Sequence, residues 1–283
     1  MKKVTIQGVA GSFHEQTVKE YFAAESVEIV ECETFAEMFS RMSADRSLMG
    51  AMAIENTIAG SLLQNHDLLQ ASDLKIVGEH KLHISHCVAA LPGETIADIK
   101  EVNSHPIALM QCQKWLGEHP SIKVVEKGDT ASSAKEIASR QLRGRAAICS
   151  KYAAQLYGLN ILEEGVETNK RNFTRFLILA DRSVAEGMVD AGAINKASLV
   201  FSLPHSAGSL SKVLSILSFY DLNLSKIQSL PIVGREWEYL FYINLSFDSR
   251  VRFHQGLEAV RPLTNDLKIL GEYVQCSNPK CSK

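Results

Sequence analysis

Short apolar runs recur along residues 1–180, and most of them end in polar residues that lead into a segment with helical spacing of apolar side chains. The runs at residues 4–6, 50–54 and 146–149 follow this order, and the last of them continues into Ser150. A repeated order of strand, polar cap and helix is typical of an α/β fold in which most strands are parallel. We therefore predict an α/β domain with mostly parallel strands for this part of the chain.

Polar residues gather where predicted strands end and predicted helices begin. Ser104 precedes Pro106 and suits an N-cap, and Asp129 with Thr130 begins another helical segment. In open α/β sheets, ligands bind at this edge, where helix N-termini offer free N–H groups and a partial positive charge. The sequence thus predicts a polar cleft that suits carboxylates.

Residues 183–195 break this pattern and are predicted to be a linker. Beyond them, apolar and polar residues alternate over 197–203 and again over 239–247, and helical spacing follows each of these runs. With a last strand over residues 267–270, we interpret residues 196–275 as the order β-α-β-β-α-β of the ferredoxin-like plait. The polar residues 276–283 are predicted to be a flexible tail.

Charge and hydropathy narrow the classes of partner. Among 283 residues, 30 Lys and Arg oppose 32 Asp and Glu, which gives a net charge of -2. Since no positive field favours nucleic acid or anionic lipid, we expect no nucleic-acid or membrane partner, and a small molecule is the better candidate. No apolar stretch approaches the roughly 20 residues of a membrane span, and the first residues do not resemble a signal peptide. We therefore expect a cytoplasmic protein.

Patterns typical of nucleotide or metal binding are weak. The turn at Gly8 and Gly11 lacks the third glycine of a dinucleotide fingerprint and the Lys-Ser/Thr pair of a Walker loop, so a tight strand-to-helix turn is the simpler interpretation. His83 would lie on the opposite face of an extended segment from His80 and His86, which disfavours a shared metal ion.

Cysteine chemistry is not expected either. Four of the six cysteines lie in apolar runs, as buried thiols in a reducing compartment do. Cys276 and Cys281 lack a second pair of metal ligands. A nucleophilic pair of His105 with Cys112 is disfavoured because Cys112 falls on the predicted buried face of its helix.

Five short motifs occur in a fixed order along the first part of the chain. They are Gly8-Val9-Ala10-Gly11-Ser12-Phe13, Ile54-Glu55-Asn56-Thr57-Ile58-Ala59-Gly60-Ser61, Ser104-His105-Pro106 with Gln111-Cys112, Asp129-Thr130-Ala131, and Asn172-Phe173-Thr174-Arg175-Phe176. In this order they closely resemble the successive motifs of the prephenate dehydratase family, over about residues 4–180. Residues 196–275 resemble an ACT domain, the small-molecule sensor that commonly follows this catalytic domain.

The resemblance implies a two-lobed α/β catalytic domain over residues 1–182, with a fold like that of type 2 periplasmic binding proteins and an active site between the lobes. Lobe one would comprise about residues 1–78 and 172–182, and lobe two about residues 80–165. The ferredoxin-like βαββαβ unit would be the regulatory ACT domain.

Members of this family convert prephenate to phenylpyruvate, CO2 and water in L-phenylalanine biosynthesis. The resemblance therefore implies a carbon–oxygen lyase whose ligand is prephenate, a cyclohexadiene with two carboxylates and a ring hydroxyl. No metal or organic cofactor is expected. Two alternatives stay open: an arogenate dehydratase, which uses the aminated substrate, and a non-catalytic small-molecule-binding protein on the same scaffold.

The resemblance also implies roles for single residues. Thr174 would be the catalytic residue that assists departure of the ring hydroxyl. The implied substrate-binding residues are Ser12, Asn56, Ser61, Ser104, Gln111, Thr130 and Arg175. Arg175 is either a carboxylate clamp or a structural ion-pair partner just outside the cleft. Glu55 is either an acid with a raised pKa or a group that orients a neighbour. Ile107 departs from the glutamine that many members carry after Ser-His-Pro.

The ACT resemblance implies feedback inhibition by L-phenylalanine bound across a dimer interface, in a homodimer or homotetramer. The implied ligand-binding residues lie at a helix N-terminus and in two loops: Ala207, Gly208, Ser209, Leu210, Asn223, Leu224, Gln228 and Ser229. Gln228-Ser229-Leu230-Pro231 stands where Glu-Ser-Arg-Pro is commoner, so a weakened or altered response is expected. An ACT domain used only for oligomerisation is the alternative.

Overall fold

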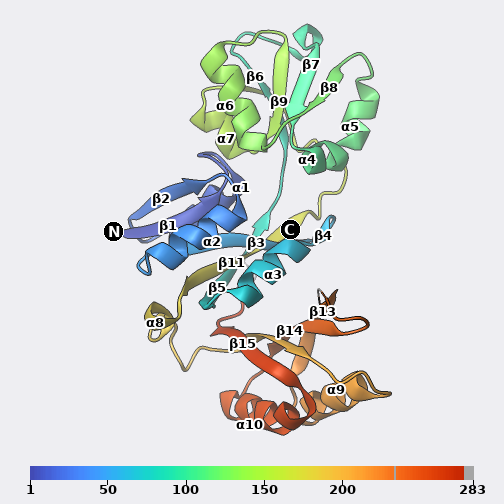
Figure 1. Cartoon of the computed structure of the whole chain (residues 1–283). Coiled ribbons are helices and arrows are strands. Elements are labelled where there is room, and N and C mark those ends of the chain that lie inside the picture. The colour runs from blue at the N-terminus through green and yellow to red at the C-terminus, as the bar shows by residue number, and fades with distance from the viewer. Residues whose placement is uncertain (233, 277–283) are drawn as a thin grey trace. The chain divides into compact units, whose positions relative to one another are not determined.

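The computed structural model describes residues 1–232 and 234–276. Their strands form three sheets, two of mixed direction and one antiparallel (Figure 1). The chain divides into two compact units. The first comprises Met1–Arg41, Leu48–Leu62 and His80–Phe176, and the second comprises Met42–Ser47, Leu63–Glu79 and the chain from Leu177 onward. None of the helices in the described residues is long and apolar enough to cross a bilayer.

The first sheet has the strand order β2-β1-β3-β11-β5, with β4 paired to β3. Its strands are β1 (Lys2–Gln7), β2 (Val27–Cys32), β3 (Met49–Asn56), β4 (Gly60–Ser61), β5 (Leu74–His83) and β11 (Phe173–Asp181). Its helices are α1 (Phe13–Tyr21), α2 (Phe35–Ala44) and α3 (Leu63–Ala71). β1 is parallel to β2 and to β3, as the crossovers through α1 and α2 require.

The turn from β1 to α1 depends on glycine. Gly8 and Gly11 have φ values of 104° and 87°, a region that side chains other than glycine rarely adopt. A Cβ at Gly11 would lie 3.2 Å from Ala153, so glycine also permits a close approach of the chain. Ser12 then begins the helix, because its Oγ accepts a hydrogen bond from the Glu15 N–H at 3.3 Å. The predicted tight turn is confirmed.

The second sheet has the order β10-β6-β9-β7-β8. Its strands are β6 (Cys87–Ala90), β7 (Glu101–Ser104), β8 (Lys123–Glu126), β9 (Arg145–Cys149) and β10 (Asn160–Glu164). Its helical segments are η1 (Ile96–Asp98), α4 (Pro106–Gln111), α5 (Gln113–Glu118), α6 (Thr130–Arg140) and α7 (Lys151–Leu156). The expectation of mostly parallel strands is wrong at β6, which is antiparallel to β9 and β10. The strand before β6 is β5, which belongs to the first sheet, so no strand–helix–strand crossover leads from a neighbouring strand into β6.

The third sheet has the order β13-β14-β12-β15, and its strands are antiparallel. It is built from β12 (Lys196–Ser202), α9 (Ser209–Phe219), β13 (Asn223–Pro231), β14 (Tyr239–Ser246), α10 (Arg250–Val260), η2 (Arg261–Leu263) and β15 (Asn265–Tyr273). Buried Phe201, Val213, Leu245 and Phe253 belong to one core between this sheet and its helices. The predicted ferredoxin-like plait is confirmed, and with it the α/β fold class.

Two segments of the C-terminal part differ from the sequence expectations. The ACT resemblance places four of the implied ligand-binding residues in loops, but the structure places them in β13. They are Asn223, Leu224, Gln228 and Ser229. β13 is an edge strand with many exposed polar residues, so its apolar alternation is too weak to mark it in the sequence. The segment predicted as a linker begins with one helical turn, α8 (Arg182–Ala185). Apart from Cys276, the predicted tail and its Cys281 lie outside the described residues.

Candidate active site

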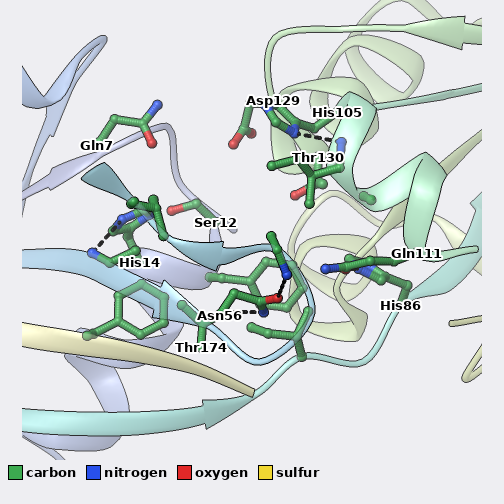
Figure 2. A pocket seen from close by; sticks show the side chains of 18 of the residues that line it. Gln7, Ser12, His14, Asn56, His86, His105, Gln111, Asp129, Thr130 and Thr174 are labelled. Carbon is green, nitrogen blue, oxygen red and sulfur yellow. Dashed lines mark hydrogen bonds between the residues drawn. The ribbon is translucent and has the colours of Figure 1, made fainter. Parts of the chain in front are cut away.

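A cavity of about 360 Å³ lies within the first unit, a volume suited to a small-molecule ligand. Figure 2 shows polar side chains that converge on it from several segments of the chain. The polar lining residues are Gln7, Ser12, His14, Asn56, Ser61, His86, His105, Gln111, Asp129, Thr130 and Thr174. Phe13, Ile84, Ile107 and Phe176 supply much of the apolar surface.

Strand ends and helix ends place the predicted residues in this cavity. Asn56 is the last residue of β3, and Thr174 is the second residue of the neighbouring β11. From the second sheet, Gln111 ends α4 and Thr130 begins α6. Ser12, Asn56, Ser61, Gln111, Thr130 and Thr174 are therefore brought together around one cavity.

The amide of Asn56 fixes the direction of the hydrogen bond to Thr174. Its Oδ1 accepts from the backbone N–H groups of Ile58 at 2.9 Å and Ala59 at 2.8 Å. Nδ2 must then donate, and the Thr174 Oγ1 lies 3.0 Å away as an acceptor. Because this oxygen already accepts from an amide, the Thr174 hydroxyl hydrogen is left for a partner other than Asn56.

The hydrogen bonds that run from Asn56 toward the second sheet have a fixed donor direction as well. Asn56 Nδ2 also donates to Asn172 Oδ1 at 2.8 Å, and Asn172 Nδ2 donates to Gln111 Oε1 at 2.8 Å. Gln111 Oε1 lies 3.0 Å from His86 Nε2, so that nitrogen carries the proton. Burial lowers the pKa of His86, which keeps the ring neutral. Gln111 is thereby oriented with its NH2 group as a remaining donor at the cavity wall.

Two predicted substrate-binding residues do not line the cavity. Ser104 is fully buried at the end of β7, where its Oγ donates to the Ile148 carbonyl at 2.6 Å. Arg175 follows Thr174 in β11 and so points to the other face of the strand, where its Nε lies 2.5 Å from Glu55 Oε1. The ion-pair alternative for Arg175 is therefore the one observed, and Glu55 is its partner.

Few charged side chains line the cavity. Asp129 is the one carboxylate among the described residues that line it, and no Lys or Arg of the described chain lines it. The N-termini of α1 and α6 both border the cavity, through Ser12 and Thr130. These two helix ends supply partial positive charge at the cavity.

Covalent and metal chemistry find little support in the described residues. Burial raises the pKa of the Cys112 thiol to about 12, so it is not a thiolate at neutral pH. Cys32, Cys87, Cys112 and Cys149 are buried and free, as predicted. Within residues 1–232 and 234–276, no group of three His, Cys, Asp or Glu side chains is arranged to hold a metal ion.

Comparison with known proteins decides the family. The family model described as prephenate dehydratase matches residues 4–184, more than half of the chain. The chain belongs to the prephenate dehydratase family. The family predicted from the five ordered motifs is therefore confirmed.

Relatives of this family member cover nearly its full length. The arogenate dehydratase/prephenate dehydratase 2 of Arabidopsis thaliana, a chloroplastic protein, is 36% identical over 96% of this chain and 72% of its own. The crystal structure of prephenate dehydratase from Arthrobacter aurescens in complex with L-Phe has a TM-score of 0.85 and 27% identity, covering 96% of this chain and 89% of its own. GqqA, described as a novel type of quorum quenching acylase, has a TM-score of 0.86 and 26% identity, covering 98% of each chain.

Sequence reasoning missed several cavity residues of this prephenate dehydratase family member. Asp129 and His105 belong to two of the five motifs and line the cavity. The sequence alone indicates only a helix cap at Asp129 and a disfavoured nucleophile pair at His105. Both do cap helices, since Asp129 Oδ1 accepts from Ser132 N at 2.8 Å and His105 Nδ1 accepts from Ile107 N at 3.2 Å. His14 and His86 carried no local signal for this site.

The pKa of His14 leads to a prediction of how the free energy of unfolding depends on pH. Its Nε2 accepts from Ala53 N at 3.4 Å, and burial lowers its pKa to about 4. The unfolded chain, with a histidine pKa near 6.5, binds more protons between these values, so stability falls as pH drops from about 6.5 to 4.

Chemical unfolding at several pH values should show that His14→Gln removes on the order of 2 kcal/mol of this acid-dependent loss. The exposed His205 is the control site. An unchanged slope in His14→Gln, equal to that in His205→Gln, would contradict the account.

Proposed function

We propose that this chain catalyses the decarboxylative dehydration of prephenate to phenylpyruvate, CO2 and water, a step in L-phenylalanine biosynthesis. The observation that carries the proposal is the Thr174 hydroxyl at the cavity, whose oxygen accepts from Asn56 and whose hydrogen is available to a ligand. Membership of the prephenate dehydratase family supports this reading.

The reaction defines what the cavity must do. The bond between the ring and its carboxylate breaks, and its electron pair enters the ring. The bond to the hydroxyl oxygen breaks at the opposite ring carbon, and the hydroxyl takes one proton to leave as water. Since the ring becomes aromatic, much of the driving force lies in the substrate. The protein must bind two carboxylates, assist departure of the hydroxyl and release CO2.

Thr174 would assist by donating a hydrogen bond to the departing oxygen. Asn56 holds the Thr174 oxygen at 3.0 Å and is itself fixed by two backbone N–H groups, so the donor is positioned before substrate binds. A donor aimed at charge that develops in the transition state stabilises it more than it stabilises the substrate. Gln111 would supply a second neutral donor, and the N-termini of α1 and α6 would receive the carboxylates.

The substrate assay separates the alternatives. Purified full-length protein is incubated with prephenate or with arogenate, and phenylpyruvate and phenylalanine are measured. Turnover of prephenate above the spontaneous rate supports the proposal. Turnover of arogenate alone would make the chain an arogenate dehydratase, and binding without turnover of either would make it a binding protein.

The cavity does not favour the acyl hydrolysis named for GqqA. Among the described residues, the Ser12 and Thr174 hydroxyls bond to Glu15 and Asn56. One ring nitrogen each of His14, His86 and His105 bonds to a backbone N–H group or to an amide oxygen, and none of these three rings bonds to a hydroxyl of the described residues. The geometry of a histidine-activated nucleophile is therefore not observed there.

We also propose that the C-terminal ACT-like domain binds L-phenylalanine and inhibits the reaction. The Arthrobacter aurescens relative was crystallised with L-Phe, which supports this ligand. The implied residues 207–210 lie at the start of the 11-residue α9, and Asn223 and Leu224 lie beyond its other end. About 16 Å of helix separates the two groups. One chain does not bring them together, so a site across two copies, in a dimer or tetramer, is the arrangement that fits.

Phenylalanine should therefore inhibit and stabilise the protein. Initial rates with prephenate should fall as phenylalanine is added, and the melting temperature should rise because the ligand binds the folded state. At 100 times the Kd, the stabilisation is about 2.7 kcal/mol. D-Phenylalanine serves as the matched control ligand. A titration that changes neither rate nor melting temperature would leave the domain an oligomerisation module.

A further inference from the structure

We infer that Asn172 is a positioning residue: its buried amide fixes the direction of the hydrogen bonds on either side of it, so that Gln111 presents N–H donors to the cavity. The inference rests on the proposed function, because the substrate of that function is a dianion, which such donors suit. Asn172 is fully buried and is not among the described residues that line the cavity. It therefore affects the ligand through its neighbours Asn56 and Gln111.

The orientation of the Asn172 amide follows from backbone groups. Asn56 Oδ1 accepts from two backbone N–H groups, so Asn56 Nδ2 faces Asn172 and donates at 2.8 Å. The atom of Asn172 that accepts this hydrogen bond is consequently Oδ1, which leaves Nδ2 to face Gln111. The Asn172 backbone carbonyl accepts from the Ile84 N–H at 2.8 Å, which holds the residue in place.

Two donors then converge on one oxygen of Gln111. Asn172 Nδ2 lies 2.8 Å from Gln111 Oε1, and His86 Nε2 lies 3.0 Å from the same oxygen (Figure 2). Rotating the Gln111 amide by half a turn would place its NH2 group against both donors. His86 could then accept only by moving its proton to Nδ1, a buried nitrogen for which the described residues supply no hydrogen-bond partner. Since an unpaired buried donor costs about 1–3 kcal/mol, the amide keeps its orientation.

The donor at position 172 can be reversed without a change of side-chain shape. Aspartate has the shape of asparagine, but its ionised form has two acceptor oxygens and no donor. It would still accept from Asn56 and would repel Gln111 Oε1, which favours the rotated amide with its oxygen toward the cavity. The protonated form has one O–H donor and one acceptor, the pattern of asparagine. In Asn172→Asp, the direction of the hydrogen bond to Gln111 therefore depends on pH.

The test follows kcat/KM for prephenate in Asn172→Asp between about pH 6 and 9, with spontaneous conversion subtracted, because burial raises the pKa of a carboxyl group toward this range. Each value is divided by that of the wild type at the same pH. The titratable groups beside this network are His86 and Glu167, which accepts from the His86 N–H at 2.8 Å. Both proteins contain them, so the division removes their contribution. We expect the ratio to fall at least about tenfold from acidic to alkaline pH, since an acceptor replaces a donor at the cavity.

Asn172→Ser is the matched control, because serine is polar but does not ionise in this range. Its side chain is too short to contact both Asn56 and Gln111, so kcat/KM should fall at least about fivefold, by the same factor at every pH. A second control separates donor direction from repulsion between the ionised aspartate and the anionic substrate. In the Gln111→Met background no amide can rotate, so Asn172→Asp should change kcat/KM with pH less than it does in the wild-type background.

Circular dichroism at each pH establishes that the variants are folded. A ratio in folded Asn172→Asp that does not change with pH, or that changes equally in the Gln111→Met background, would overturn the inference and leave the proposed function standing. Full kcat/KM in Asn172→Ser would overturn the inference as well, even where Asn172→Asp does not fold. A wild type without turnover of prephenate would overturn the proposed function, and the inference with it.

Discussion

Replacing Thr174 by alanine is expected to lower kcat on prephenate by about 100-fold or more, with the fold intact. The size follows from the loss of one positioned donor to the leaving group, a contribution of roughly 10²–10⁴ in rate. The Thr174 side chain is buried at the cavity wall, where Asn56 holds its oxygen at 3.0 Å. Because the lost hydrogen bond strengthens in the transition state, kcat should fall far more than KM changes.

Thr174→Ser is the matched control, because it keeps the hydroxyl that Asn56 orients. It should retain most of the turnover that Thr174→Ala loses. Circular dichroism and melting temperature establish that both variants fold. Near-normal turnover in folded Thr174→Ala would remove Thr174 from its assigned role and require another group at the departing oxygen.

Replacing Lys196 by methionine is expected to destabilise the second unit by about 3–5 kcal/mol, the range measured when one partner of a buried ion pair is removed. Lys196 Nζ lies 2.9 Å from both carboxylate oxygens of Glu79. The two side chains are 5% and 0% exposed, so neither charge has water as a substitute. Glu79 Oε1 also accepts from the Cys276 N–H at 3.1 Å. Without Lys196 the Glu79 carboxylate loses its charged partner, and either protonating or hydrating the buried group costs free energy.

Two variants test this explanation for Lys196. Lys196→Met combined with Glu79→Gln removes both charges and should be less destabilised than Lys196→Met alone. Lys2→Met breaks the exposed pair of Lys2 with Glu25, whose side chains are 40% and 45% exposed, and should cost at most about 1 kcal/mol. Denaturant unfolding measures all three. A loss in Lys196→Met no larger than that in Lys2→Met would show that the buried pair does not stabilise the protein.

Much of the site follows from local sequence chemistry. Asn56 and Thr130 stand where an apolar strand ends or a capped helix begins, and such ends meet at one edge of α/β sheets. Thr174 and Gln111 carry no such local signal and were found only through the order of the motifs. The family was predictable because several weak motifs in one order are far more specific than any one of them.

The remainder depends on contacts that sequence spacing does not encode. Ser104 is turned inward by its bond to the Ile148 carbonyl, a residue from another strand. Arg175 forms an ion pair with Glu55 on the face of β11 opposite Thr174. Asn172, which links Asn56 to Gln111, is completely buried and looks in the sequence like one more motif residue. Such partners become visible only when both sheets are in place.

The most direct test of the central proposal is the stoichiometry of prephenate consumption by the purified full-length protein. We predict that phenylpyruvate and CO2 appear in equal amounts, one of each for every prephenate consumed, at a rate well above the spontaneous reaction and reduced about 100-fold in Thr174→Ala. Prephenate that remains unconverted while it binds would contradict the proposed function, and an equal rate in wild type and Thr174→Ala would contradict the role assigned to Thr174.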